Sequence, residues 1–201
     1  MPANEQPPRL RLFCAIALSD VVRVRAYDQL RRLRASAPQV KASWEREEKL
    51  HVTLKFLGET EAERVSALTE AATRAATGVS SFELTLEGAG VFPPTRDPRV
   101  LWLGIKDSQG QLAGLHERLE AECVAAGFAR DPRPFHAHVT LARIRTANAA
   151  ARRLARYHQQ LGFAPLPFAV NALSIMRSDL TSNGSQYTLL SRHTLAGSIT
   201  E

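Results

Sequence analysis

The sequence predicts an α+β fold built from two related halves. The tetrapeptide His-Val-Thr-Leu occurs at residues 51–54 and again, letter for letter, at residues 138–141. Each copy lies in a segment with the apolar alternation of a strand, and helical segments separate the strands in both halves. Several predicted strands follow one another directly, which favours antiparallel pairing. Because the copies are too far apart for a solenoid repeat, they indicate one internal duplication.

The first half is expected to alternate between strands and helices. Its predicted elements are, in order, a strand at 9–18, a helix at 19–35, strands at 40–44 and 50–57, and a helix at 60–76. Ser19 can cap the first helix, and Gly58 is expected to end the strand before the second helix. Thr60 and Glu63 have the spacing of a capping box. The arginines on the outer faces of the first helix face either solvent or RNA.

The second half follows the same rules. Its predicted elements are strands at 82–86 and 100–105, a helix at 112–126, a strand at 135–144, a helix at 147–161, and strands at 168–176 and 187–190. A turn-rich loop separates the first two strands. Gly127 is a typical helix stop, and Asn183-Gly184 is a typical hairpin turn.

Composition limits the class of protein. The 201 residues are enough for one domain, so we expect a single bilobal domain over 9–201 after a flexible tail at 1–8. No apolar run is long enough to span a membrane. The two cysteines, Cys14 and Cys123, are expected to be buried, reduced thiols of a cytoplasmic protein. The net charge of +6 favours an anionic partner.

The first repeated motif places polar side chains on one face of its strand. Residues i and i+2 of a strand face the same way, so His51 and Thr53 share a face, with Lys55 beyond them. Val52 and Leu54 share the opposite, apolar face and anchor the strand to the core.

The second motif is expected to behave in the same way, with His138 and Thr140 on one face. Two halves related by a pseudo-twofold axis would point the two pairs at each other. Two facing imidazoles suit displacement at phosphorus without a metal, since histidine can give or take a proton near neutral pH. Threonine hydroxyls can stabilise the charge that builds on the phosphate oxygens.

Four segments together resemble a known family. They are Arg11-Leu12-Phe13-Cys14-Ala15-Ile16, the run from His51 to Glu59, the run from Arg133 to Arg143, and the tail from Ser178 to Thr188. In these segments the chain resembles the two-histidine phosphoesterases, specifically the LigT-like RNA 2′,3′-cyclic phosphodiesterases, also called RNA 2′-5′ ligases. The similarity spans nearly the whole chain after residue 9.

The resemblance implies a fold and an activity. The expected fold is bilobal, with two antiparallel sheets flanked by helices and the motif strands lining a central cleft. The expected reaction is hydrolysis of a ribose 2′,3′-cyclic phosphate to a 2′-phosphate without a cofactor, with reversible 2′-5′ RNA joining left open. The expected partner is RNA with a 2′,3′-cyclic phosphate end, tRNA halves included among the candidates. A groove between the two lobes would complete the site within one chain, so the expected state is a monomer.

The resemblance also implies roles for individual residues. His51 would donate a proton to the leaving 3′-oxygen, and His138 would accept a proton from water. Thr53 and Thr140 would bind the phosphate. Physical reasoning alone does not assign which histidine is the acid, because the roles exchange in the reverse reaction.

Two further residues are candidates for substrate binding. Arg143 matches a family position that touches the phosphate, but five residues from His138 it would face the wrong side of a regular strand. It reaches the motif face only if the strand ends or bulges near Ala142. Phe13 either stacks on a base or packs in the core.

The sequence leaves three alternative functions open. His136 and His138, with His51 opposite, could hold zinc. The chain could instead be a non-catalytic module that binds RNA ends. It could also be a phosphodiesterase that acts on small cyclic nucleotides rather than on RNA. Loss of activity in a chelator would favour the first alternative, and tight binding without turnover would favour the second.

Overall fold

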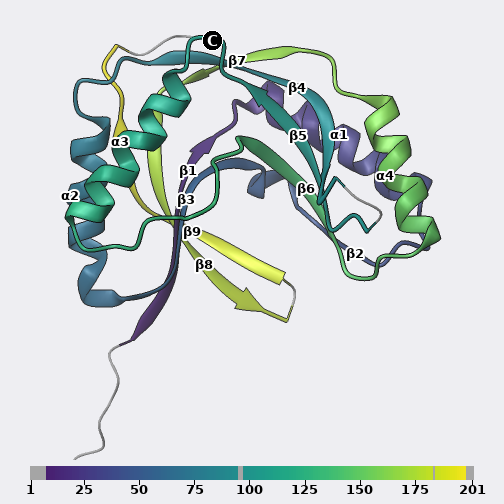
Figure 1. The fold of residues 1–201 in the computed structure, drawn as a ribbon, viewed down its shortest axis with the longest axis horizontal. Helices are drawn as coiled ribbons and strands as arrows, with labels where there is room; N and C mark the ends of the chain where they lie inside the picture. Colours follow the sequence, from purple (N-terminus) through teal and green to yellow (C-terminus); the bar gives the residue numbers. More distant parts are fainter. Residues whose placement is uncertain (1–7, 95–96, 183, 198–201) are drawn as a thin grey trace, which may run out of the picture.

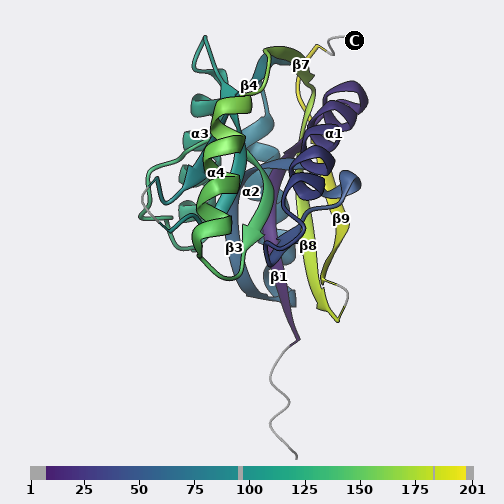
Figure 2. The same cartoon turned by 90° about the vertical axis from the view of Figure 1, so that its right-hand side faces the viewer.

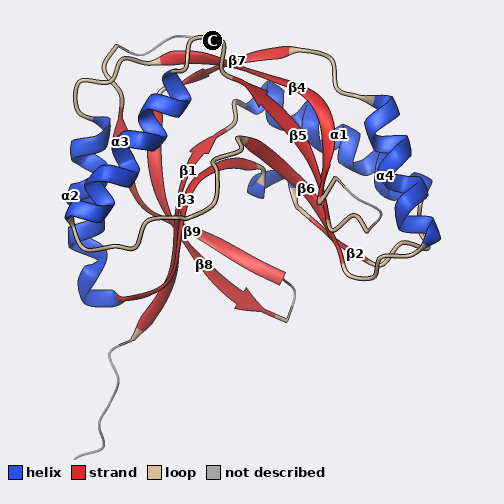
Figure 3. Ribbon diagram, viewed as in Figure 1, coloured by secondary structure: helices blue, strands red, loops and turns tan. Residues whose placement is uncertain are grey.

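The computed structural model describes residues 8–94, 97–182 and 184–197. Residues 1–7 of the predicted tail and Asn183 of the predicted turn lie outside the described residues. Strands form one large curled sheet, and helices flank it on two sides (Figure 3). The predicted α+β class is therefore confirmed.

The sheet is antiparallel and has nine strands. They are β1 (Arg9–Ala17), β2 (Ala42–Trp44), β3 (His51–Glu61), β4 (Phe82–Phe92), β5 (Val100–Lys106), β6 (His138–Ile144), β7 (Leu166–Val170), β8 (Ala172–Thr181) and β9 (Gly184–Thr194). Their order is β7-β4-β5-β6-β3-β1-β8-β9, and β2 pairs with β6. The two motif strands, β3 and β6, are therefore neighbours at the centre of the sheet.

The two halves of the sheet meet at a single residue pair. Val52 of β3 lies opposite Val139 of β6, and this pair is the whole register between the two strands. The two sheets expected from the sequence are thus joined into one. The valines are the second residues of the two copies of the motif, so the duplication is centred on the junction.

Within the described residues, four α-helices cover the halves in pairs. They are α1 (Asp20–Ser36), α2 (Val65–Ala76), α3 (Gln111–Ala125) and α4 (Ala149–Leu161), with 3-10 turns at Glu47–Lys49 and Ala62–Arg64. Helices α2 and α3 pack together beside β3, β8 and β9 (Figure 1). Helices α1 and α4 lie on the other side, where α1 contacts β6 and β7 (Figures 1 and 2). Each half is therefore covered by one helix from each part of the chain.

The core lies between the helices and the sheet. The helix stripe Leu112, Leu115, Leu119 and Cys123 is buried there, as is Cys14 of β1. The expected burial of both thiols is confirmed, and neither forms a disulfide. None of the described helices has the length and apolar character needed to cross a membrane.

The connection between β3 and α2 differs from the prediction. Gly58 does not end the strand, because β3 continues to Glu61 in register with Arg9 of β1. Gly58 has a φ of +69°, which glycine tolerates without strain. Thr60 does not cap a helix: it is buried in the strand, and its hydroxyl donates to the Gly58 carbonyl. Ser19 does precede α1, but its side chain forms no capping hydrogen bond.

The strand predicted at 168–176 is two strands. The chain leaves β4 after β7 and crosses to the other half of the sheet, where β8 pairs with β1. Phe168 and Val170 of β7 and Leu173 and Ile175 of β8 are all buried, so the alternation changes phase at the break around Asn171. The strand predicted from Phe135 begins only at His138.

Candidate active site

The two motifs have the same burial pattern residue for residue. His51 and Thr53 are half-buried, whereas Val52, Leu54 and Lys55 are buried and Phe56 is exposed. The run from His138 to Arg143 repeats this sequence of exposures. In both strands the valine and leucine join the core under the helices. The histidine and threonine therefore lie on the opposite, helix-free face of the sheet.

The central register brings the two motifs together. Val52 faces Val139 in an antiparallel pair. Continuing that register by one residue in each direction places His51 opposite Thr140 and Thr53 opposite His138. The four polar side chains thus form one group on one face, related by the pseudo-twofold that the sequence predicts.

Backbone carbonyls orient both imidazole rings in the same way. The Nδ1–H of His51 donates to the Lys49 carbonyl at 2.6 Å, and that of His138 donates to the His136 carbonyl at 2.7 Å. A carbonyl only accepts, so in each neutral ring the lone pair is on Nε2. The Thr53 hydroxyl donates to Nε2 of His51 at 3.0 Å. Among the described residues, none donates to Nε2 of His138.

A β-bulge places Arg143 on the face that carries the motif histidines and threonines. Leu101 of β5 pairs with Ala142 and Trp102 pairs with Thr140, which leaves Leu141 as an extra residue in β6. The bulge resets the alternation, so Leu141 and Ala142 are both buried and Arg143 emerges exposed beside the motif. The strand therefore bulges near Ala142, as Arg143 requires in order to reach the motif face.

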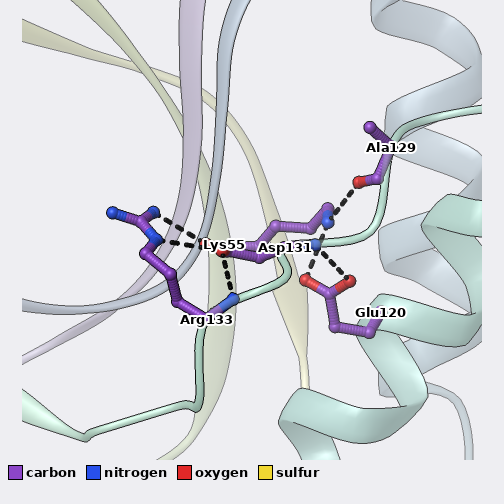
Figure 4. A network of polar contacts seen from close by, with 5 residues as sticks. All are labelled: Lys55, Glu120, Ala129, Asp131 and Arg133. Atoms are coloured by element: carbon purple, nitrogen blue, oxygen red, sulfur yellow. Dashed lines mark hydrogen bonds and ion pairs between the residues drawn. The ribbon is translucent and has the colours of Figure 1, made fainter.

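The equivalent bulge in β3 moves Lys55 away from the site. Cys14 pairs with Lys55 and Ala15 pairs with Thr53, so Leu54 is the extra residue. The prediction that Lys55 lies beyond Thr53 on the motif face is therefore wrong. Lys55 is buried and bonded to Glu120 of α3 at 2.7 Å (Figure 4).

This buried ion pair ties the first motif strand to the chain that leads into the second. Lys55 also donates to the Ala129 carbonyl at 2.9 Å, and the Asp131 amide donates to Glu120 at 3.4 Å. Ala129 and Asp131 belong to the connection between α3 and β6 (Figure 4). The pair therefore fixes the position of the segment that carries His136 and His138.

Two aromatic rings hold the ring of His51. Phe13 of β1 and Tyr187 of β9 lie 5.0 and 5.5 Å from its centroid, and they are 5.0 Å from each other. Phe13 is only 3% exposed, so little of its surface is free for a base. Its position favours support of His51, whereas its role as a stacking residue stays a prediction.

A different pair of aromatic rings surrounds His138. The ring of Phe92 lies 5.2 Å from His138, and that of Trp102 lies at 6.2 Å. Both also contact His136, whose carbonyl orients His138. An ideal Cβ on Gly90 would come within 2.2 Å of Trp102 ring atoms, so glycine makes room for this indole.

Sequence reasoning missed the aromatic partners other than Phe13. Trp102 could have been found, because it is an aromatic residue on the side of its strand opposite Leu101 and Leu103. Tyr187 lies in a segment that carried the family resemblance but no chemical motif. Its contact with His51 depends on β9 returning beside β8, and no local pattern reveals that.

The electrostatic environment disfavours a charge on either histidine in the free protein. Burial lowers the pKa of His51, and the positive charges of Arg143 and His138 lower it further, against the Lys49 hydrogen bond. Burial, His136 and Arg143 likewise lower the pKa of His138, against the hydrogen bond to the His136 carbonyl. Arg143 therefore acts on both imidazoles. An anion bound beside them would oppose these shifts.

A carboxylate also lies near Arg143. Burial raises the pKa of Glu45, and the charges of Arg143 and Lys49 oppose that rise. Glu45 follows β2, and its amide donates to the Leu141 carbonyl at 2.9 Å. No sequence motif includes Glu45. Its place beside the bulge makes it a neighbour of the guanidinium rather than of the imidazoles.

Removing the Arg143 charge is expected to raise the pKa of both His51 and His138. A positive neighbour disfavours imidazolium, so Arg143→Ala should move both titrations to higher pH, and Arg143→Lys should leave them close to wild type. NMR titration of the histidine ring resonances measures both shifts. Unchanged or lower values in Arg143→Ala would show that the guanidinium does not act on this site.

The remaining sequence candidates lie outside the central group. Trp44 packs against the core. His116 stacks on Phe135 at 4.0 Å, His158 is fully buried, and His193 bonds to Thr73 of α2. In the described ranges, no group of three or more His, Cys, Asp or Glu side chains is arranged to hold a metal ion. His51, His136 and His138 therefore do not converge as the zinc alternative requires.

The fold and the paired His-Thr strands define a class. An antiparallel sheet that carries two symmetry-related His-x-Thr strands at its centre is the arrangement expected of two-histidine phosphoesterases. A family model described as the 2′-5′ RNA ligase superfamily matches residues 21–181. The chain belongs to this superfamily.

Relatives with similar sequences and structures agree with this assignment. A Thermotoga maritima protein named RNA 2′,3′-cyclic phosphodiesterase is 32% identical, over 90% of this chain and 93% of its own length. An Archaeoglobus fulgidus protein of the same name is 31% identical, over 89% of this chain and 96% of its own. The crystal structure of Escherichia coli LigT with 3′-AMP superposes with a TM-score of 0.73 at 30% identity, covering 94% of this chain and 100% of that one.

Proposed function

We propose that this chain is an RNA 2′,3′-cyclic phosphodiesterase that hydrolyses the cyclic phosphate to a 2′-phosphate, with His51 and His138 as its acid–base pair. The observation that carries the proposal is the symmetric site: two imidazoles on one face, each with Nδ1–H fixed by a carbonyl. The relatives' shared name supports the substrate class.

Each bond change in the proposed reaction has a group to serve it. Nε2 of His138 accepts a proton from water as the water oxygen attacks phosphorus. The bond between phosphorus and the 3′-oxygen breaks, and Nε2–H of a protonated His51 delivers its proton to that oxygen. The product is a 2′-phosphomonoester and a 3′-hydroxyl, and a proton exchange with solvent resets the pair. Acid–base steps of this kind contribute about 10²- to 10⁴-fold each.

The assignment of acid and base has one structural support. Nε2 of His51 accepts the Thr53 hydroxyl in the free protein, whereas within the described residues Nε2 of His138 has no donor and is open to a water molecule. The active form needs one imidazolium and one neutral imidazole. The anionic substrate favours the imidazolium, since it offsets the burial that lowers the pKa of both rings.

Phosphate binding is assigned to the side chains between the imidazoles. The hydroxyls of Thr53 and Thr140 lie beside the two rings and can donate to the non-bridging oxygens as charge builds there. Arg143, exposed on the same face, supplies a positive charge for the same oxygens. Each of these roles is part of the proposal.

The proposal includes several finer features. They are a cytoplasmic location, a monomeric state, tRNA halves as a natural substrate, and reversible 2′-5′ joining in which the two histidines exchange roles. Action on small cyclic nucleotides is a related activity of the same site, since the chemistry acts on the ribose phosphate alone.

The test is the position of the phosphate in the product. A short RNA with a 2′,3′-cyclic phosphate end is incubated with the protein, and the product is resolved by ³¹P NMR against 2′- and 3′-phosphate standards. A 2′-phosphate is expected. A 3′-phosphate would show that the 2′-oxygen is the leaving group instead. RNA that stays bound and unreacted would favour the non-catalytic binding module.

A further inference from the structure

A cavity lies beside the catalytic group, between β3 and the connection that leads to β6. It has a volume of about 330 Å³ and is lined by Phe56, Leu57 and residues 128–133. The Lys55–Glu120 pair holds this connection in place from the core side (Figure 4). The cavity is not part of the site described above, because none of His51, Thr53, His138 and Thr140 lines it.

Phe56 turns an aromatic ring toward solvent on the catalytic face. The bulge at Leu54 gives Phe56 the orientation that Arg143 has in the second motif, on the same side as His51. Phe56 is 41% exposed, and the Arg11 guanidinium lies 4.7 Å from the centroid of its ring. An exposed aromatic ring with an arginine against it is a typical platform for an unpaired nucleic-acid base.

The wall of the cavity carries a positive balance. Arg130 and Arg133 line it, and Arg11 lies over the Phe56 ring, against one carboxylate, Asp131. Asp131 accepts two hydrogen bonds from the Arg133 side chain, at 2.8 and 3.0 Å, so it is already engaged. Three positive charges and one negative leave a net charge of +2, which favours a phosphate beside the ring.

Tyr187 and Arg11 lie between the cavity and His51. Tyr187 contacts His51 at 5.5 Å. Burial raises the pKa of Tyr187, and the charges of Arg143 and Arg11 oppose this rise, so Arg11 lies within electrostatic range of the tyrosine. Arg11 in turn covers Phe56. Phe56 is three residues beyond Thr53, about 10 Å along the strand.

The chemistry of the substrate restricts where its chain can go. A 2′,3′-cyclic phosphate is the 3′ end of its RNA, so every other nucleotide lies on its 5′ side. We propose that the cavity is the subsite for a nucleotide on that 5′ side, with its base against Phe56 and its phosphate near Arg130 and Arg133. This subsite rests on the proposed function and makes single-stranded RNA a better substrate than a cyclic mononucleotide.

The test compares two substrates, a 2′,3′-cyclic mononucleotide and a pentaribonucleotide with the same 3′-terminal nucleotide. In Phe56→Leu the kcat/KM for the pentamer, divided by that for the mononucleotide, is expected to fall about tenfold, because one stacked base is lost. In Arg130→Gln the salt dependence of log kcat/KM for the pentamer should weaken by about one unit of slope. The matched control is Arg192→Gln.

Arg192 is a suitable control because it lines a second cavity, of about 360 Å³, together with Ala17 and Leu189. Ala17 pairs with His51, so this cavity lies at the end of the motif strand opposite Phe56. If Arg192→Gln lowers the pentamer-to-mononucleotide ratio and the Phe56 and Arg130 variants do not, the RNA leaves the site on that side and the proposal is overturned. An equal loss with both substrates in Phe56→Leu would also overturn it, since the ring would then support only the strand.

A binding measurement keeps the inference separate from catalysis. Fluorescence anisotropy of the pentamer that ends in a 2′-phosphate reports affinity without turnover. Weaker binding in Phe56→Leu and Arg130→Gln, with Arg192→Gln at the wild-type value, supports the subsite even if the hydrolysis is not observed. Equal affinity in all four proteins rules the subsite out, whatever the result for the proposed function.

Discussion

His51→Ala and His138→Ala are each expected to lower kcat/KM for RNA with a 2′,3′-cyclic phosphate end by about three orders of magnitude. Each removes one proton-transfer group, and such a group contributes about 10²- to 10⁴-fold. The two rings act in one step, so the double variant should lose much less than the product of the two single losses. Single-turnover rates of the three variants and the wild type measure these effects.

His193→Gln is the matched control for the histidine variants. Its ring lies on the helix side of the sheet, where it bonds to Thr73 and Ser191. Its rate should stay within about twofold of wild type, as expected for a substitution away from the reacting groups. A His51 or His138 variant that keeps more than a tenth of the wild-type rate would remove that residue from the acid–base pair.

Lys55→Met is expected to destabilise the protein by about 3–5 kcal/mol, because it leaves the buried carboxylate of Glu120 without its cation. The side chains of the pair are 1% and 5% exposed. Replacing both residues, in Lys55→Met with Glu120→Leu, should recover most of this loss, since an apolar pair of similar volume replaces a buried ion pair at little cost. Urea unfolding measures the free energies of unfolding.

Lys106→Met provides the comparison for a solvent-exposed pair. Lys106 lies 3.7 Å from Glu87, with side chains 57% and 32% exposed. Its loss should cost under about 1 kcal/mol. A Lys55→Met variant that is no less stable than Lys106→Met would show that Glu120 finds another partner or is protonated in the fold.

The placement of the motif side chains could be predicted from the sequence because it depends on local periodicity. Alternation along a strand places His51 with Thr53 and Val52 with the core, and the second copy repeats this around Val139. The duplication predicts the pseudo-twofold arrangement. The structure adds that a single valine pair joins the halves, so the two motif strands are direct neighbours in the sheet.

The bulges mark the point where periodic reasoning fails. One extra residue, Leu54 in β3 and Leu141 in β6, inverts the side chains that follow it, in β3 as far as a second bulge at Leu57. That inversion makes Lys55 a core residue and places Phe56 and Arg143 on the face that carries the motif histidines. A leucine gives no local signal of a bulge. Only the family match at Arg143 indicated that regular alternation breaks down there.

Contacts between distant parts of the chain could not be predicted from the sequence for a different reason. Tyr187 contacts His51 across two other strands of the sheet, and Phe92 reaches His138 from a neighbouring hairpin. These contacts depend on strand order rather than on any local pattern. The same holds for the partnership between Lys55 and Glu120, which joins residues 65 positions apart.

The metal-free two-histidine mechanism is tested most directly by turnover of RNA with a 2′,3′-cyclic phosphate end. The protein is first dialysed exhaustively against EDTA, and EDTA is present in the assay. Two imidazoles that supply both proton transfers need no metal, so the wild-type rate is expected to be unchanged and the product to be a 2′-phosphate. A rate that is lost in EDTA and restored by added zinc would contradict the metal-free two-histidine mechanism.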